Sequence, residues 1–213
     1  MKIIGLDLSG PTNTADTCLA LFEARGSGLA YLDSIQGAGD ARILEVASHH
    51  LKAGALVIGL DAPLSYQPGG GDRPSDAELR RLVKARGGTG VMTPTMTRMA
   101  YLTLRGVALT RLLSRLRPWA DLRLVEVHPG AVLMLRGAPP ADVAGFKRAP
   151  GPRLRLLSRL GRLGLQDVPM REDVSDHFVA ACAAALGAWQ WALGKSAWLF
   201  RADPPLHPYD FAC

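Results

Sequence analysis

The alternation of apolar and polar positions in the first 36 residues predicts three strands. Apolar residues dominate 2–8, 16–24 and 28–36, and turn-forming residues separate these runs at 11–13 and 25–28. Connections this short favour antiparallel pairing.

The next segment predicts a helix followed by a buried strand. Residues 40–54 place apolar side chains at helical spacing, with Asp40 near the start and Gly54 at the end. Residues 55–64 form an unbroken apolar run, which is typical of a strand that is covered on both faces. A right-handed strand–helix–strand connection places this fourth strand beside the first.

The remainder of the chain alternates between helices and strands. Pro139-Pro140 and FKRAPGPR (146–153) indicate a loop, and we expect the Pro-rich tail 203–213 to lie across the surface. Together the pattern predicts one α/β domain over 1–213, a sheet of about five strands and a basic, mostly helical insertion at about 65–120. The further elements expected are helices over 76–86, 93–118, 153–165 and 173–194 and strands over 122–129 and 196–202.

Composition narrows the class of protein. A hydrophobic content of 48% supports a packed core, and no apolar stretch reaches the length needed to span a bilayer. Met1-Lys2 leads directly into the first strand, which leaves no room for a signal peptide. Three scattered cysteines (Cys18, Cys182 and Cys213) make neither a disulfide framework nor a zinc site. We therefore expect a reduced, cytoplasmic protein with no membrane partner.

The positive charge is clustered along the chain. The formal net charge is +6, and the segments 73–117 and 136–171 hold 18 of the 25 basic residues. A clustered positive field attracts a polyanion such as DNA or RNA. The alternative is that these arginine-rich helices simply expose solvated faces.

Four aspartates fall where the predicted fold would bring them together. Asp7 ends the first strand, Asp61 ends the fourth, and Asp173 and Asp176 open the last long helix. If the two strands are neighbours, their acids lie side by side at the sheet edge where α/β proteins bind ligands. Clustered carboxylates need a counter-charge, for which Mg²⁺ or Mn²⁺ is the natural choice. Two such ions about 4 Å apart would clamp the attacking water and the leaving oxygen of a phosphodiester.

Each acid also has a simpler interpretation. Asp173 or Asp176 alone is typical of a helix N-cap, and Asp61 before Ala-Pro is compatible with a turn. Glu126 on the strand 122–129 is either a further ligand, an acid that orients a nearby basic side chain, or a solvent-facing residue at a strand edge.

Two histidines are candidate proton donors or acceptors. His128 follows the strand that carries Glu126, and His177 directly follows Asp176. A structural hydrogen-bonding role is the alternative for both.

Five segments, in this order, resemble the domain of unknown function 429 family: IIGLDLSG, VIGLDAPL, VEVHPGAV, FKRAPGPRLRLL and DVSDHFVAACAAAL. The resemblance covers roughly residues 2–200 and implies a ribonuclease H-like fold and predicted nuclease activity. That fold is a mixed five-stranded sheet, with three antiparallel strands followed by parallel ones, flanked by helices. RuvC-like resolvases of the wider superfamily carry acids on the first strand, the fourth strand and the last helix. The matching positions here are Asp7, Asp61, Asp173 and Asp176.

The expected function is hydrolysis of phosphodiester bonds in nucleic acid by a two-metal-ion mechanism. Glu126 joins the four aspartates as a candidate catalytic residue. Contacts with the phosphate backbone would bind nucleic acid without sequence preference. The residues expected to contact it are Ser9, Arg80, Arg81, Lys84, Arg86, Arg98, Lys147 and Arg153.

Two other functions are compatible with the same sequence. One is a non-catalytic nucleic-acid-binding module, and the other is an ATP-handling enzyme of the actin and sugar-kinase type, which requires two such domains. The choice between DNA and RNA stays open, as does a homodimer, which cutting of a junction would require.

Overall fold

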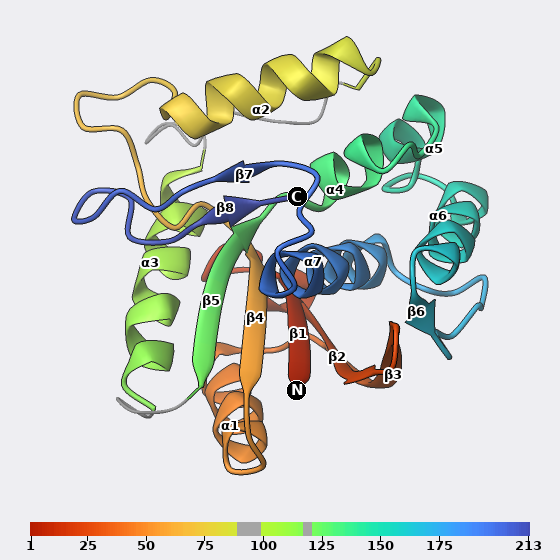
Figure 1. The fold of residues 1–213 in the computed structure, drawn as a ribbon, viewed down its shortest axis with the longest axis horizontal. Coiled ribbons are helices and arrows are strands. Elements are labelled where there is room, and N and C mark those ends of the chain that lie inside the picture. The colour runs from red at the N-terminus through yellow and green to blue at the C-terminus, as the bar shows by residue number, and fades with distance from the viewer. Residues whose placement is uncertain (89–98, 117–120) are drawn as a thin grey trace.

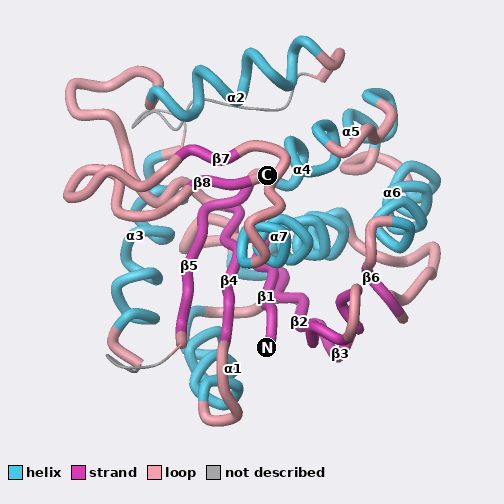
Figure 2. Tube along the Cα trace, viewed as in Figure 1, coloured by secondary structure: helices cyan, strands magenta, loops and turns pink. Residues whose placement is uncertain are grey.

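The computed structural model describes residues 1–88, 99–116 and 121–213. Within them the chain forms an α/β fold in which helices cover both faces of one mixed sheet, as Figures 1 and 2 show. The predicted α/β class is confirmed. Every helix in these residues is too short or too polar to cross a bilayer.

The sheet has eight strands in the described residues, of which five are long and three are only two residues long. Across the sheet the order is β6-β3-β2-β1-β4-β5-β8-β7. In chain order the strands are β1 (Lys2–Asp7), β2 (Cys18–Arg25), β3 (Gly28–Gln36), β4 (Leu56–Asp61), β5 (Leu122–Val127), β6 (Leu165–Gln166), β7 (Leu199–Phe200) and β8 (Phe211–Ala212). One short strand, β7, lies within the strand predicted over 196–202, whereas β6 and β8 are additional to the prediction.

The five long strands are paired as the connection lengths predict. β1 is antiparallel to β2, and β2 is antiparallel to β3. β4 is parallel to β1, and β5 is parallel to β4. The expected placement of the fourth strand beside the first is therefore confirmed.

Seven α-helices lie in the described residues. They are α1 (Asp40–Leu51), α2 (Pro74–Ala85), α3 (Ala100–Ser114), α4 (Pro129–Leu135), α5 (Pro140–Gly145), α6 (Pro150–Arg162) and α7 (Asp176–Ala192).

Prolines that suggest a loop in the sequence begin helices instead. α4, α5 and α6 each have proline in the first turn, where the missing N–H has no helical partner to lose. The loop predicted around 139–153 is therefore wrong for most of its length. The helix predicted over 93–118 is α3, and the ends of that range lie outside the described residues.

Alternate residues of the central strands face two separate hydrophobic cores. Ile4 and Leu6 of β1 point toward α1 and α3, whereas Ile3 points toward α7. Because side chains alternate along a strand, Asp7 shares the α7 face with Ile3.

Two glycines at the same level of neighbouring strands let α7 approach the sheet closely. Gly5 of β1 is in register with Gly59 of β4, and both lie against α7, which crosses these strands in Figure 1. A Cβ on Gly5 would overlap the carbonyl oxygen of Ala181, and one on Gly59 would lie 2.7 Å from that of Ala184. The alanines of α7 complete this contact, which fixes the position of α7 on the sheet.

The last three residues of the C-terminal tail enter the sheet instead of lying on the surface, whereas residues 203–206 are exposed as the sequence suggests. Residues Phe211–Ala212 form β8, which is parallel to β5 and antiparallel to β7. Cys213 is buried and makes backbone hydrogen bonds with Ala197 and Trp198. The tail enters the sheet because β5 would otherwise leave its edge unpaired at this level.

Gly59→Ala tests the close contact between α7 and the sheet. We expect it to lower the free energy of unfolding by about 3 kcal/mol, because the new methyl group meets helix backbone rather than a flexible side chain. The measurement is urea-induced unfolding followed by circular dichroism. Gly161→Ala is the control, since that Cβ would meet nothing within 4 Å and alanine favours the helix. Equal stability of both variants would contradict the proposed constraint.

Candidate functional site

Two aspartates end neighbouring parallel strands at the same level. Asp7 of β1 and Asp61 of β4 are register partners, so their Cα atoms lie directly side by side. Both are only partly exposed and both line the same cavity. The sequence-based expectation that these two acids come together agrees with the structure.

The cavity above these two acids has a volume of about 530 Å³. Its wall contains three basic residues, Arg73, Lys147 and Arg148, and apolar side chains such as Leu102 and Phe211. The acids that line it are Asp7, Asp16, Asp61, Asp76, Glu126 and Asp176.

Asp61 strongly favours its protonated form. Burial raises its pKa well above the usual range, and the charge of Asp7 and a hydrogen bond with Asp7 raise it further. Lys147 acts in the opposite direction, but more weakly. A cation bound between the two carboxyl groups would relieve the same repulsion.

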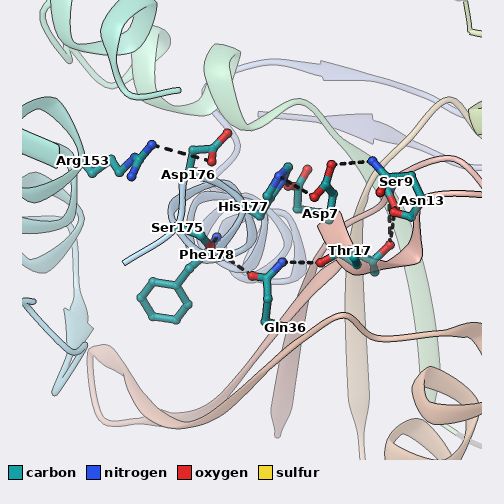
Figure 3. Close-up of polar contacts among 12 residues, drawn as sticks. Asp7, Ser9, Asn13, Thr17, Gln36, Arg153, Ser175, Asp176, His177 and Phe178 are labelled. Carbon is teal, nitrogen blue, oxygen red and sulfur yellow. Dashed lines mark hydrogen bonds and ion pairs between the residues drawn. The ribbon is translucent and has the colours of Figure 1, made fainter. Parts of the chain in front are cut away.

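His177 binds Asp7 from the first turn of α7. Its Nδ1 lies 2.7 Å from Oδ2 of Asp7, and its Nε2 lies 3.8 Å from Oδ1 of Asp16 (Figure 3). The hydrogen bond with Asp7 raises the pKa of His177, although partial burial opposes this change. A protonated His177 therefore compensates part of the negative charge at Asp7.

The start of α7 places its two predicted acids differently. Ser175 is the N-cap, and its side chain accepts a hydrogen bond from the N–H of Phe178. Asp176 is the first helical residue and lines the cavity. Asp173 precedes the helix, is 72% exposed and forms an ion pair with Arg171. The structure thus leaves Asp173 outside the cavity, because the N-cap is two residues later than expected.

Arg153 of α6 holds the loop that follows α5. Its guanidinium donates to the carbonyl oxygens of Phe146, Lys147 and Val174, at 2.7, 3.2 and 3.2 Å. It also lies 3.9 Å from the carboxylate of Asp176 (Figure 3). Arg153 therefore fixes Lys147 at the cavity wall, a role in positioning rather than the direct substrate contact expected from sequence.

A second arginine fixes the loop after β1. Arg105 of α3 is buried, donates to the carbonyl oxygen of Ser9 at 2.8 Å and to Oγ1 of Thr17 at 2.7 Å, and pairs with Asp40. Ser9 Oγ lies 2.7 Å from Thr17 Oγ1 and so belongs to this network (Figure 3). No local sequence signal identifies Arg105, because its partners are far away in the chain.

Glu126 is bound by protein groups on the side of the cavity nearest α2. Arg73 donates two hydrogen bonds to its carboxylate, and the N–H of Leu64 donates a third. Arg73 also pairs with Asp76, and all three charged side chains are buried. Burial alone would lower the pKa of Arg73, but the charges of Glu126 and Asp76 outweigh it and raise the pKa. The structure therefore places Glu126 in a buried ion network; it is not a free ligand.

Of the other basic residues predicted to contact nucleic acid, Arg80, Arg81 and Lys84 lie on α2, and Arg86 directly follows it. Arg80 forms an ion pair with Asp72. Arg98 lies outside the described residues. The exposed members of the set are Arg81, Lys84 and Arg86 of α2 and its C-terminal end, and Lys147 beside the cavity.

The oxygen donors of Asp7 and Asp61 suit a hard divalent cation. Within residues 1–88, 99–116 and 121–213, no group of three or more His, Cys, Asp or Glu side chains is arranged to hold a metal ion. The structure thus brings together one carboxylate pair, with Asp176 in the same cavity, rather than the four converging aspartates expected from sequence.

One family model, described as "Protein of unknown function (DUF429)", matches residues 5–204. The chain belongs to the DUF429 family. The resemblance carried by the five sequence segments is thereby confirmed at the level of the family. Among curated proteins, none matches the chain. The description of the DUF429 family names no activity, so the function is argued from the site itself.

Asp61→Asn should stabilise this DUF429 protein at neutral and alkaline pH. When folding raises the pKa of an acid, the free energy of unfolding falls as the pH rises from the unfolded-state pKa of about 4 through the folded-state pKa. Asparagine removes that loss, and we expect a gain of about 1 kcal/mol at about pH 8 in the absence of divalent cations. Thermal unfolding over a pH series measures it, with the exposed Asp173→Asn as the control. A destabilised Asp61→Asn protein would contradict the assignment.

His177→Ala should destabilise the DUF429 protein mainly at low pH. A histidine whose pKa is raised on folding contributes stability that is complete below its unfolded pKa of about 6.5 and is lost as pH rises through the folded value. We expect a loss of about 2 kcal/mol at about pH 5.5 and a smaller loss at about pH 9. Urea unfolding at both values tests this, and a pH-independent difference would show that the ion pair with Asp7 is unimportant.

Proposed function

We propose that this DUF429 protein is a metal-dependent phosphodiesterase that acts on nucleic acid. The observation that carries the proposal is the pair of carboxylates, Asp7 and Asp61, side by side at the carboxyl ends of parallel strands and facing a large cavity. A purely structural role does not account for such a pair, because placing two partly buried carboxyl groups side by side is electrostatically unfavourable.

The proposal includes a ribonuclease H-like fold for the central sheet. The order β3-β2-β1-β4-β5, antiparallel for the first three strands and parallel for the last two pairings, supports it. In this description α2 and α3, which lie between β4 and β5, form the basic insertion.

The acids of the cavity would hold Mg²⁺ or Mn²⁺. Asp7 and Asp61 would share one ion, and Asp7 with Asp176 would hold a second. Bound cations supply Lewis acidity for a phosphoryl oxygen and for the attacking water. His177 orients the carboxylate of Asp7 through a hydrogen bond with Oδ2, which would leave Oδ1 for a cation.

Basic residues around the cavity would bind the phosphates. Lys147 lies in the cavity wall, where Arg153 holds its backbone, and its charge acts on Asp61. The exposed Arg81, Lys84 and Arg86 extend a positive surface along α2. Contacts of this kind recognise the backbone of a nucleic acid without reading its sequence.

Asp7→Asn tests the assignment in a cleavage assay with Mg²⁺ or Mn²⁺. The panel contains single-stranded and double-stranded DNA and RNA, a hybrid and a branched junction. We expect wild type to cleave at least one of these and Asp7→Asn to lower kcat at least about 100-fold, because the lost carboxylate would be shared by both ions. Asp173→Asn is the matched control and should keep its activity, since Asp173 is exposed and lies outside the cavity.

A substrate-independent measurement accompanies the assay. Mn²⁺ should raise the melting temperature of wild type and of Asp173→Asn, but not that of Asp7→Asn. Equal cleavage by wild type and Asp7→Asn would refute the proposed site, as would cleavage that persists in excess chelator. Binding of nucleic acid with no cleavage and no response to metal would instead support the non-catalytic module.

A further inference from the structure

A smaller cavity opens between the C-terminal end of α2 and the helices α4 and α5. We call it the side cavity, and the cavity that Asp7 and Asp61 line is the main cavity. The side cavity has a volume of about 270 Å³. In Figure 1, α4 and α5 follow each other below the end of α2. Much of its wall is aliphatic and comes from Val83, Met134, Pro140 and Val143.

The side cavity and the main cavity share a wall. Four residues line both cavities: His128, Gly130, Val143 and Ala144. The chain continues from this wall in helical turns to Lys147, which lines the main cavity. Val143 and Lys147 are one helical turn apart, roughly 5 Å along the axis. An apolar wall and a positive charge therefore lie about as far apart as the base and the phosphate of one nucleotide.

Glycines keep the side cavity open. A Cβ on Gly87 would lie 3.3 Å from Cγ of Pro140, and one on Gly130 would lie 3.1 Å from Cε1 of His128. Since all four residues line the side cavity, a side chain at either glycine would narrow it. Gly87 also has a φ of 79°, a backbone conformation that favours glycine.

We propose that the side cavity receives a nucleobase of the bound nucleic acid and that the substrate of this DUF429 protein is single-stranded. The inference rests on the phosphodiesterase function proposed above. Apolar side chains accept the flat face of any base, and an unpaired base is free to leave the stack. In a duplex, each base is paired and stacked, so a nucleotide must be flipped out at a cost in free energy before its base can enter a pocket.

The charge beside the shared wall favours a nucleotide over an uncharged apolar ligand. Lys147 and Arg148 are exposed, and both line the main cavity. An anionic group at these side chains would lie next to the entrance of the side cavity. A ligand that carries a flat apolar ring close to a phosphate matches both features, and the nucleotide whose phosphate approaches Asp7 and Asp61 is such a ligand.

Filling the side cavity tests the proposal. Ala141→Phe adds a ring at an exposed residue that lines the side cavity. Ala41→Phe is the matched control, because Ala41 is also exposed and is also the second residue of its helix. Fluorescence anisotropy measures binding of short labelled DNA and RNA oligonucleotides, single-stranded and duplex, with Ca²⁺ as the oxygen-binding cation. We expect wild type to bind the single strand at least about tenfold more tightly than the duplex, and Ala141→Phe to remove most of that difference.

Each result of the binding experiment has a definite meaning. Equal affinity of Ala141→Phe and Ala41→Phe for the single strand would overturn the nucleobase site and leave Asp7-dependent cleavage intact. A duplex bound by wild type as tightly as the single strand would overturn the single-stranded substrate. Single-strand binding that Ala141→Phe weakens, without any cleavage, would support the nucleobase site and refute only the phosphodiesterase. Failure of wild type to bind every oligonucleotide would overturn both proposals.

Removing a base from the oligonucleotide is the complementary test. An abasic nucleotide keeps its phosphate but has no ring to place in the side cavity. In wild type, we expect one abasic nucleotide to slow cleavage of the adjacent bond about tenfold and to leave distant bonds unchanged. In Ala141→Phe, the same nucleotide should have little further effect, because both changes remove one interaction. Cleavage beside the abasic nucleotide at the rate of the intact strand would overturn the proposal.

Discussion

The close contact between α7 and the sheet is the constraint on which the site depends. Gly5 and Gly59 remove two side chains at one level of β1 and β4, and the alanines of α7 occupy that space. Helix backbone then lies against strand backbone, so the helix cannot slide without a steric clash. Because α7 is fixed in this way, its first turn reaches Asp7, and His177 is within hydrogen-bonding distance of that carboxylate.

Two buried arginines hold the elements around the cavity in place, although burying their charges costs desolvation free energy. Arg73 joins α2 to β5 through Glu126, and Arg105 joins α3 to the loop after β1 through Ser9 and Thr17. Removing one partner from a buried ion pair is far more harmful than losing a surface pair, since the other charge stays desolvated. The cavity is therefore surrounded by rigid polar networks, while Asp7 and Asp61 at its base are held in an electrostatically unfavourable pair. Natural proteins keep such local conflict mainly where function requires it.

Sequence reasoning located the central strands and the pair formed by Asp7 and Asp61, because both follow from short-range rules. Alternating polarity and connection length determine that β4 lies beside β1, and the strand ends then bring the two acids together. Asp173 was harder to place, since only the structure shows that Ser175 caps the helix. The partner of Glu126 was not predictable either: Arg73 is 53 residues earlier in the chain, and nothing local to either residue indicates the pair. The two-residue strands β6 and β8 form where neighbouring strands leave an edge to pair with, which is a property of the folded sheet.

The buried side chain of Arg105 connects α3 to the centre of the protein. Its backbone belongs to α3, yet its side chain is bonded to the loop that follows Asp7 and to Asp40 at the start of α1. The position of α3 and the conformation of the loop beside Asp7 are therefore coupled through one buried side chain.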